Sequence, residues 1–250
     1  MYDADTRASA FLRSYAEEFD SVEIDSTFYG IPDRERCVRW ARSVPASFRF
    51  ALKLTREITH DRKLFASGAL VREFFTNVAG LGDRLGAVLV QLPPAFTPDD
   101  RRALDAFLPE LPRDVRCAIE FRDPRWYEPP LFDEIAVQLR ERNIALALAD
   151  APFIALPLLL ARVAQPTADF HYLRWIGVID AIPTVDHMVI DRSEDLARWA
   201  DALRGCSATM LFGYANNNYE GHAPATIRRL FALLDVDHTP PRRIRQTSLF

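Results

Sequence analysis

Short apolar runs alternate with amphipathic segments along almost the whole chain, and this alternation limits the possible folds more than any other feature. Several runs are apolar nearly throughout, which is typical of strands buried on both faces of a sheet. Leu131, Ile135 and Leu139 illustrate the helical periodicity between the runs. Strands that alternate with helices predict an α/β protein with a parallel sheet. The seven runs cover residues 21–26, 48–52, 85–91, 115–121, 144–149, 169–175 and 207–214.

The composition is that of a folded protein. The 250 residues are 49% hydrophobic and 26% charged, which excludes a disordered chain, a collagen and a coiled coil. No run approaches the roughly 20 apolar residues that cross a bilayer, and the first residues do not resemble a secretory signal. Cys37, Cys117 and Cys206 form no Cys-x-x-Cys pair, which indicates reduced thiols. We therefore expect a soluble, cytoplasmic protein with no membrane partner.

The last twelve residues differ in charge from the rest. The 31 Lys and Arg against 35 Asp and Glu give a formal charge of −4. Arg242, Arg243 and Arg245 contribute +3 to residues 239–250, so −4 minus +3 leaves −7 on residues 1–238. A body this acidic is a poor general binder of nucleic acid. We predict a single domain over residues 1–238, followed by a basic, flexible tail over residues 239–250.

Polar residues at the ends of the runs distinguish two kinds of parallel sheet. An open dinucleotide-binding sheet should carry a Gly-x-Gly-x-x-Gly fingerprint after its first strand, and this fingerprint is absent. A ring of polar groups at successive strand ends is how (β/α) barrels build their sites. The pattern therefore favours a TIM-type (β/α) barrel. The polar residues at or just beyond the run ends are Glu23, Lys53, Gln91, Glu120, Arg122, Asp150, Arg174, Asn216 and Asn217.

Six segments, in order, resemble the YecE-like family, which is catalogued as domain of unknown function seventy-two. They are VEIDSTFYGIP (22–32), LKLTREITH (52–60), LGAVLVQLPPAF (85–96), AIEFRDPRW (118–126), FHYLRWIG (170–177) and GYANNNYEGHAPAT (213–226). The resemblance runs from about residue 2 to residue 234. It implies a TIM-type barrel, but no particular activity, because the members of the family have no settled one.

The sequence departs from the family pattern in two places. Family members usually begin with a strand that carries a Gly-Thr-Ser-Gly-Trp-like motif, and no such strand is present here, which agrees with seven runs instead of eight. Either the start site is placed too late or the barrel lacks one wall, which would expose the edges of two strands. In addition, Ile176 replaces a His in the family's Arg-x-His-Gly segment. If that His transfers protons in the family, this chain must do without it.

The cations of the predicted ring point to an anionic ligand. Lys53, Arg122 and Arg174 would surround one mouth, and Asn216 and Asn217 precede a helix whose N-terminus would attract an anion. The alternative is that the asparagines only cap the helix. We expect a small anionic substrate that carries phosphate or carboxylate. A nucleotide-like substrate would fit this mouth if the C-terminal motif described below binds the sliding clamp.

The candidate acid–base groups are Glu120, His60 and Asp150. Glu120 and Arg122 lie two residues apart, so an ion pair would keep the Glu120 carboxylate charged, in either a catalytic or a purely structural role. His60 would titrate near neutrality. Three carboxylates, those of Glu23, Glu120 and Asp150, would suit Mg²⁺ or Mn²⁺ if they converged. We nevertheless expect no cofactor, because no strand end carries a cluster of histidines.

Three further residues are expected to bind the substrate. Tyr29 and Trp126 would offer aromatic faces for a base or a sugar ring, although packing over the barrel rim explains them equally well. Gln91 precedes two prolines that would fix its loop, so its amide is a plausible substrate ligand.

The final five residues, QTSLF, resemble the bacterial sliding-clamp-binding motif Gln-x-Ser/Asp-Leu-Phe. Leu249 and Phe250 would fill an apolar pocket of the clamp, and Gln246 would make an orienting hydrogen bond. The alternative is that Leu249 and Phe250 fold back onto the barrel. The sequence as a whole predicts a barrel hydrolase or lyase tethered to the DNA sliding clamp. Two alternatives remain, a non-catalytic binding module and a metal-dependent isomerase or nuclease.

Overall fold

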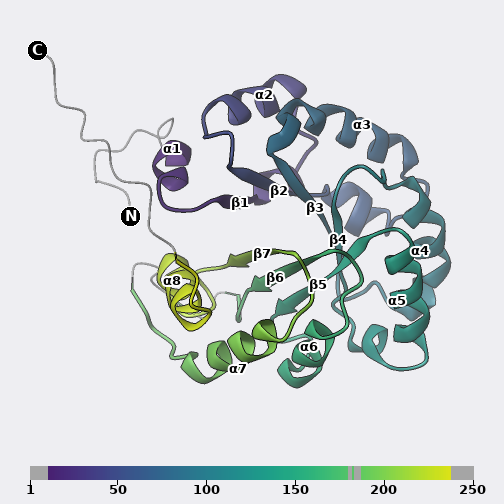
Figure 1. Ribbon diagram of the computed structural model, residues 1–250. Helices are drawn as coiled ribbons and strands as arrows, with labels where there is room; N and C mark the ends of the chain where they lie inside the picture. Colours follow the sequence, from purple (N-terminus) through teal and green to yellow (C-terminus); the bar gives the residue numbers. More distant parts are fainter. Residues whose placement is uncertain (1–10, 180–181, 183–186, 238–250) are drawn as a thin grey trace, which may run out of the picture.

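The computed structural model describes residues 11–179, 182 and 187–237 and consists of parallel strands alternating with helices (Figure 1). The strands join in sequential order into one sheet of seven strands within these residues. They are β1 (Ser21–Ile24), β2 (Arg49–Lys53), β3 (Leu85–Gln91), β4 (Cys117–Glu120), β5 (Ile144–Asp150), β6 (Phe170–Trp175) and β7 (Met210–Ala215). Every predicted run overlaps one of these strands, and the predicted TIM-type barrel is confirmed.

The helices form an outer layer around the curved sheet (Figure 1). None of the described helices is both long enough and apolar enough to span a membrane. They are α1 (Phe11–Ala16), α2 (Arg34–Arg42), α3 (Gly68–Val78), α4 (Arg101–Phe107), α5 (Leu131–Glu141), α6 (Leu156–Val163), α7 (Ser193–Arg204) and α8 (Ala223–Leu233).

Alternation along the strands decides which side chains fill the barrel. Successive side chains of a strand point to opposite faces, so every second residue points inward. One wall, formed by β2 to β5, contributes mainly alanines to the interior, and the opposite wall, formed by β6 and β7, contributes aromatic rings. The small side chains leave the volume that the rings fill. The interior residues are Ala51, Ala87, Leu89, Ala118, Ala145, Ala147, Phe170, Tyr172, Phe212 and Tyr214.

The same alternation, continued to the C-terminal ends of the strands, places polar residues above this apolar plug. Lys53 and Gln91 lie two residues beyond Ala51 and Leu89, and Glu120 and Arg174 lie two residues beyond interior positions of β4 and β6. Glu23 is in register with the inward-facing Ala51 of the neighbouring strand. The polar residues that point inward at the C-terminal end of the barrel are therefore Glu23, Lys53, Gln91, Glu120 and Arg174.

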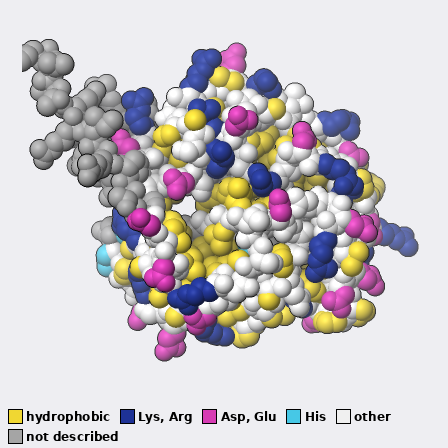
Figure 2. Space-filling model, viewed as in Figure 1, with side chains coloured by type: hydrophobic (Ala, Val, Ile, Leu, Met, Phe, Trp, Pro, Cys, Tyr) yellow, Lys and Arg dark blue, Asp and Glu magenta, His cyan; other side chains and the backbone are white. Residues whose placement is uncertain are grey.

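The barrel is nearly closed, and its opening lies between β1 and β7. Within the described residues, β1 pairs only with β2 and β7 pairs only with β6. A cavity of about 740 Å³ lies between these edge strands, lined in part by Tyr15, Ile227 and Leu230 from the flanking α1 and α8. The surface is hollowed here, with hydrophobic side chains around the hollow (Figure 2).

Candidate functional site

A row of alternating charges crosses the barrel at the C-terminal ends of its strands. Arg174 of β6 binds Glu23 of β1 with two nitrogens, since Nη2 lies 2.6 Å from Oε1 and Nε lies 3.0 Å from Oε2. Its third nitrogen, Nη1, donates to Oε2 of Glu120 in β4 at 2.8 Å. The other oxygen of Glu120 accepts from Nε of Arg122, also at 2.8 Å. We call Glu23, Arg174, Glu120 and Arg122 the charge row.

The charge row is almost entirely removed from water. The side chain of Glu120 is 0% exposed and that of Arg174 is 5% exposed. Burial alone would raise the pKa of Glu120, but the guanidinium groups of Arg174 and Arg122 outweigh it and lower the pKa below its usual value. Burial likewise opposes the charge of Arg174, yet Glu23 and Glu120 raise its pKa. Glu120 and Arg174 therefore both stay ionised.

Tyr172 completes the inner end of the charge row. Its hydroxyl donates to Oε2 of Glu23 at 2.6 Å. Burial and the neighbouring Glu23 carboxylate raise the pKa of Tyr172 well above its usual value, so this hydroxyl keeps its proton. Glu23 thus accepts bonds on both oxygens, from Arg174 and from Tyr172.

A second cation lies on the neighbouring strand. Nζ of Lys53 lies 3.2 Å from Oδ1 of Asp25, whose side chain is 60% exposed. The same Nζ lies 4.6 Å from the centre of the Phe28 ring, a cation–π distance. Asp25 and Phe28 both belong to a short 3-10 helix, η2 (Asp25–Phe28), which follows β1 directly. The loop after β1 therefore holds the end of Lys53 in place.

His60 lies between these two groups of charges. It belongs to one turn of π-helix, η3 (Glu57–Asp61), and its Nδ1 lies 2.9 Å from the Thr59 hydroxyl. Burial lowers the pKa of His60 to about 4, and the positive charges of Arg122 and Lys53 add to the effect. His60 is therefore neutral at pH 7. The centres of the His60 and Phe28 rings are 4.9 Å apart, and Lys53 Nζ lies 4.6 Å from the same Phe28 ring centre. Arg122 is close enough for its charge to act on His60, so the three side chains lie around one mouth.

Two aromatic side chains flank this mouth. The guanidinium of Arg122 lies 5.0 Å from the centre of the Phe153 ring, which holds Arg122 on its outer side. Tyr29 follows η2, and its ring centre is 5.4 Å from that of Phe28. Tyr29 is 82% exposed.

Two of the expected site residues lie apart from the mouth. Asp150 ends β5 in register with the outward-facing Trp175, and its Oδ2 accepts from Trp199 Nε1 at 2.8 Å and from the Tyr219 hydroxyl at 2.9 Å. Burial raises the pKa of Asp150 although both bonds act against it. Trp126 is only 1% exposed, and its Nε1 donates to a backbone oxygen. It offers no free face for stacking.

The asparagines and the glutamine have different surroundings. Oδ1 of Asn217 accepts from the backbone N–H of Ala223, the first residue of α8, and Oδ1 of Asn216 accepts from that of Asn218. Both asparagines line the cavity between β1 and β7. Gln91 is buried in register with Glu120, next to the charge row.

The carboxylates do not form a cation site. Glu23 and Glu120 are joined by the guanidinium of Arg174, which occupies the space where a metal ion would bind, and Asp150 faces the helix layer. No three His, Cys, Asp or Glu side chains of the described residues come together as metal ligands.

Sequence reasoning missed two residues that help to organise the site. The Tyr172 hydroxyl donates to Glu23, and the Asp25 carboxylate pairs with Lys53. Tyr172 lies on β6 two residues before Arg174, so its inward orientation could have been predicted from the sequence. The expected clamp-binding residues Gln246, Leu249 and Phe250 lie outside the described residues.

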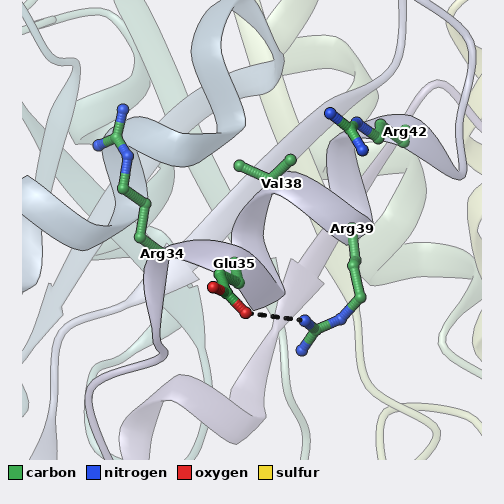
Figure 3. A pocket seen from close by; sticks show the side chains of 5 residues that line it. All are labelled: Arg34, Glu35, Val38, Arg39 and Arg42. Atoms are coloured by element: carbon green, nitrogen blue, oxygen red, sulfur yellow. Dashed lines mark ion pairs between the residues drawn. The ribbon is translucent and has the colours of Figure 1, made fainter.

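A second depression, of about 390 Å³, lies on the outer face of α2 (Figure 3). Arg34, Arg39 and Arg42 line it, but they point in different directions, and Arg39 pairs with Glu35 at 3.9 Å. Both partners of this pair are mostly exposed. Exposed ion pairs of this kind contribute little to stability. The depression therefore lacks the buried, paired charges that organise the barrel mouth.

A comparison with known families shows to which family the chain belongs. The family model described as "Protein of unknown function DUF72" matches residues 1–248. The chain belongs to the DUF72 family. This confirms the resemblance to the YecE-like family that the sequence motifs indicate.

Relatives of the DUF72 chain are known in sequence and in structure. It is 35% identical to UPF0759 protein YecE of Escherichia coli over 116 residues, which span 46% of this chain and 43% of YecE. UPF0759 protein YunF of Bacillus subtilis is 24% identical over 98% of this chain and 94% of its own length. A crystal structure of a DUF72 protein from Enterococcus faecalis has a TM-score of 0.74 at 24% identity, covering 92% of this chain and 95% of that one. A DUF72 structure from Thermotoga maritima covers 94% of this chain and 92% of its own at a TM-score of 0.71 and 21% identity. These structures share the fold.

The charge row predicts a large cost for removing its central cation. Arg174→Met should lower the free energy of unfolding by about 3–5 kcal/mol, because it removes the guanidinium that pairs with two buried carboxylates. Arg39→Met, which breaks an exposed pair, should cost less than about 1 kcal/mol. Urea unfolding followed by circular dichroism measures both.

If Arg174→Met does not fold, Arg174→Met combined with Glu23→Gln and Glu120→Gln should, because the uncompensated charges are gone. Equal costs for Arg174→Met and Arg39→Met would contradict the structural importance of the charge row.

Proposed function

We propose that this DUF72 protein is an enzyme, a hydrolase or lyase, that acts on a substrate bearing phosphate or carboxylate at the barrel mouth. The observation that carries the proposal is the gathering of Lys53, His60 and Arg122 in front of the buried charge row. Ionisable groups with strongly shifted pKa values at a barrel mouth are typical of active sites. The same three side chains supply charge and proton transfer.

Lys53 and Arg122 are the anion-binding pair in this proposal. Asp25, the partner of Lys53, is largely exposed, so it holds the ammonium weakly and an incoming anion competes with it easily. Arg122 uses Nε for Glu120, and its outward Nη groups suit a phosphate or carboxylate, which a guanidinium binds with two parallel hydrogen bonds. Arg174 plays a different part, because its three nitrogens already bind Glu23 and Glu120.

His60 is the proposed proton-transfer group. Without ligand, its pKa of about 4 leaves the imidazole neutral and weakly basic. An anion between Lys53 and Arg122 offsets their positive charges and raises the pKa toward neutrality, where acid–base catalysis is most effective. Glu120, expected as the base from the sequence, has both oxygens bound to guanidinium groups, and we assign it the role of positioning Arg122.

The proposal predicts a ligand-dependent pKa for His60. NMR titration of the imidazole should give a pKa near 4 without ligand and a higher value in the presence of inorganic phosphate. His171 is the matched control, because it is buried on β6 but faces outward, and its lowered pKa has burial as the cause. If His60 titrates identically without phosphate and with phosphate at high concentration, there is no anion site here.

The proposed reaction class is tested by turnover. A panel of phosphoesters and carboxylate esters should include at least one substrate, and His60→Gln should slow its turnover by about 10²–10⁴-fold. Arg39→Met, on the outer face of α2, should be as active as the unmodified protein. A compound that binds at the mouth, whose binding depends on Lys53, and that is recovered unchanged would favour a non-catalytic binding module instead.

We also propose that the C-terminal motif tethers the protein to the DNA sliding clamp. The support is the sequence QTSLF at residues 246–250, beyond the proline pair Pro240 and Pro241. Leu249→Ala together with Phe250→Ala should abolish binding to the clamp of the same organism in surface plasmon resonance. Thr247→Ala changes the variable position of the motif and should bind normally. Undiminished affinity of the double variant would rule out this tether.

A further inference from the structure

Tyr29 is an exposed aromatic ring held beside the proposed anion site. It is 82% exposed, so burial cannot account for it. It follows η2 directly, and its ring meets that of Phe28 edge to face at an interplanar angle of 82°. Phe28 in turn contacts the His60 ring, with 4.9 Å between the two centres. Tyr29 is therefore held by its contact with Phe28 while most of its surface remains exposed.

The distance from this ring to the anion site is short. Lys53 Nζ lies 4.6 Å from the Phe28 ring centre, and the Tyr29 ring centre lies 5.4 Å from it. The separation of Tyr29 from the ammonium cannot exceed the sum of these two distances. A phosphate at Lys53 and a ring stacked on Tyr29 therefore fit within one small molecule.

The bonds that the carboxylates of the mouth already make indicate which kind of ligand ring would stack on Tyr29. A sugar ring is recognised through its hydroxyl groups, which need free carboxylate or amide acceptors. At this mouth Glu23 and Glu120 are bound by Arg174, Arg122 and Tyr172. The carboxylate of Asp25 is paired with Lys53. What the mouth offers is positive charge and a flat aromatic face, the combination that recognises phosphate and nucleobase.

From the geometry, and resting on the proposed anion site, we infer that the substrate is a nucleotide. Its phosphate binds between Lys53 and Arg122, and its base stacks on the exposed ring of Tyr29. Phe153 has a different part, since Arg122 lies over its ring. The mouth thus recognises two features of one ligand, the charge of the phosphate and the flat face of the base.

Calorimetric titration of the full chain with adenosine 5′-monophosphate, ribose 5-phosphate and adenosine tests this inference. Adenosine 5′-monophosphate should bind about 5- to 150-fold more tightly than ribose 5-phosphate, the contribution of one base stacked on an aromatic ring. Tyr29→Leu keeps an apolar side chain but removes the ring, and should abolish this preference without changing the affinity for ribose 5-phosphate. Tyr29→Phe should retain it. Because Tyr29 is exposed, neither change should affect folding.

The outcomes separate this inference from the function on which it rests. Equal affinities for the two phosphates, or a preference for the nucleotide that Tyr29→Leu leaves intact, would overturn the stacking role of Tyr29 while leaving the anion site in place. If neither phosphate binds, or if Lys53→Met leaves their affinities unchanged, the anion site itself is wrong. Adenosine binding as tightly as the nucleotide would contradict both.

Discussion

The guanidinium of Arg174 is the interaction on which the mouth of this barrel depends. It joins a carboxylate on β1 to a carboxylate on β4, strands that lie on different sides of the barrel. Charges this deeply buried are tolerated only with close partners, so the two strands must keep the spacing that the three side chains dictate. Tyr172 and Arg122 extend the same set of bonds inward and outward. The ion pairs thus organise the end of the barrel that the apolar plug leaves open.

The chemistry of the mouth follows from this arrangement. Glu120 orients Arg122, and burial, supported by the positive charges of Arg122 and Lys53, keeps His60 neutral. Binding and proton transfer are then coupled, because the ligand itself supplies the charge that makes His60 a better base. The side opening between β1 and β7 is a separate feature, which reaches Glu23 and Arg174 from the α1 and α8 side.

The sequence predicts the fold well because strand burial and helix periodicity are local patterns that survive folding. Strand ends alone were a weaker guide to the site. Glu23, Lys53, Glu120 and Arg174 occupy inward-facing positions of their strands. Asp150 lies three residues beyond the inward-facing Ala147 of β5, and this odd offset points it outward to Trp199. Whether a strand residue points inward or outward can be predicted from its position in the alternation. The burial of Trp126 against Phe96 of the loop after β3 cannot be predicted in this way, because it depends on packing between segments far apart in the chain.

A crystal structure with bound phosphate tests the central claim most directly, because it shows where an anion binds relative to the charge row. The account predicts phosphate oxygens within hydrogen-bonding distance of Lys53 Nζ and the outer nitrogens of Arg122, close to His60, with the bonds of Arg174 to both carboxylates intact. Phosphate found only at other sites, with Lys53 and Arg122 turned away from a vacant mouth at saturating concentration, would contradict it.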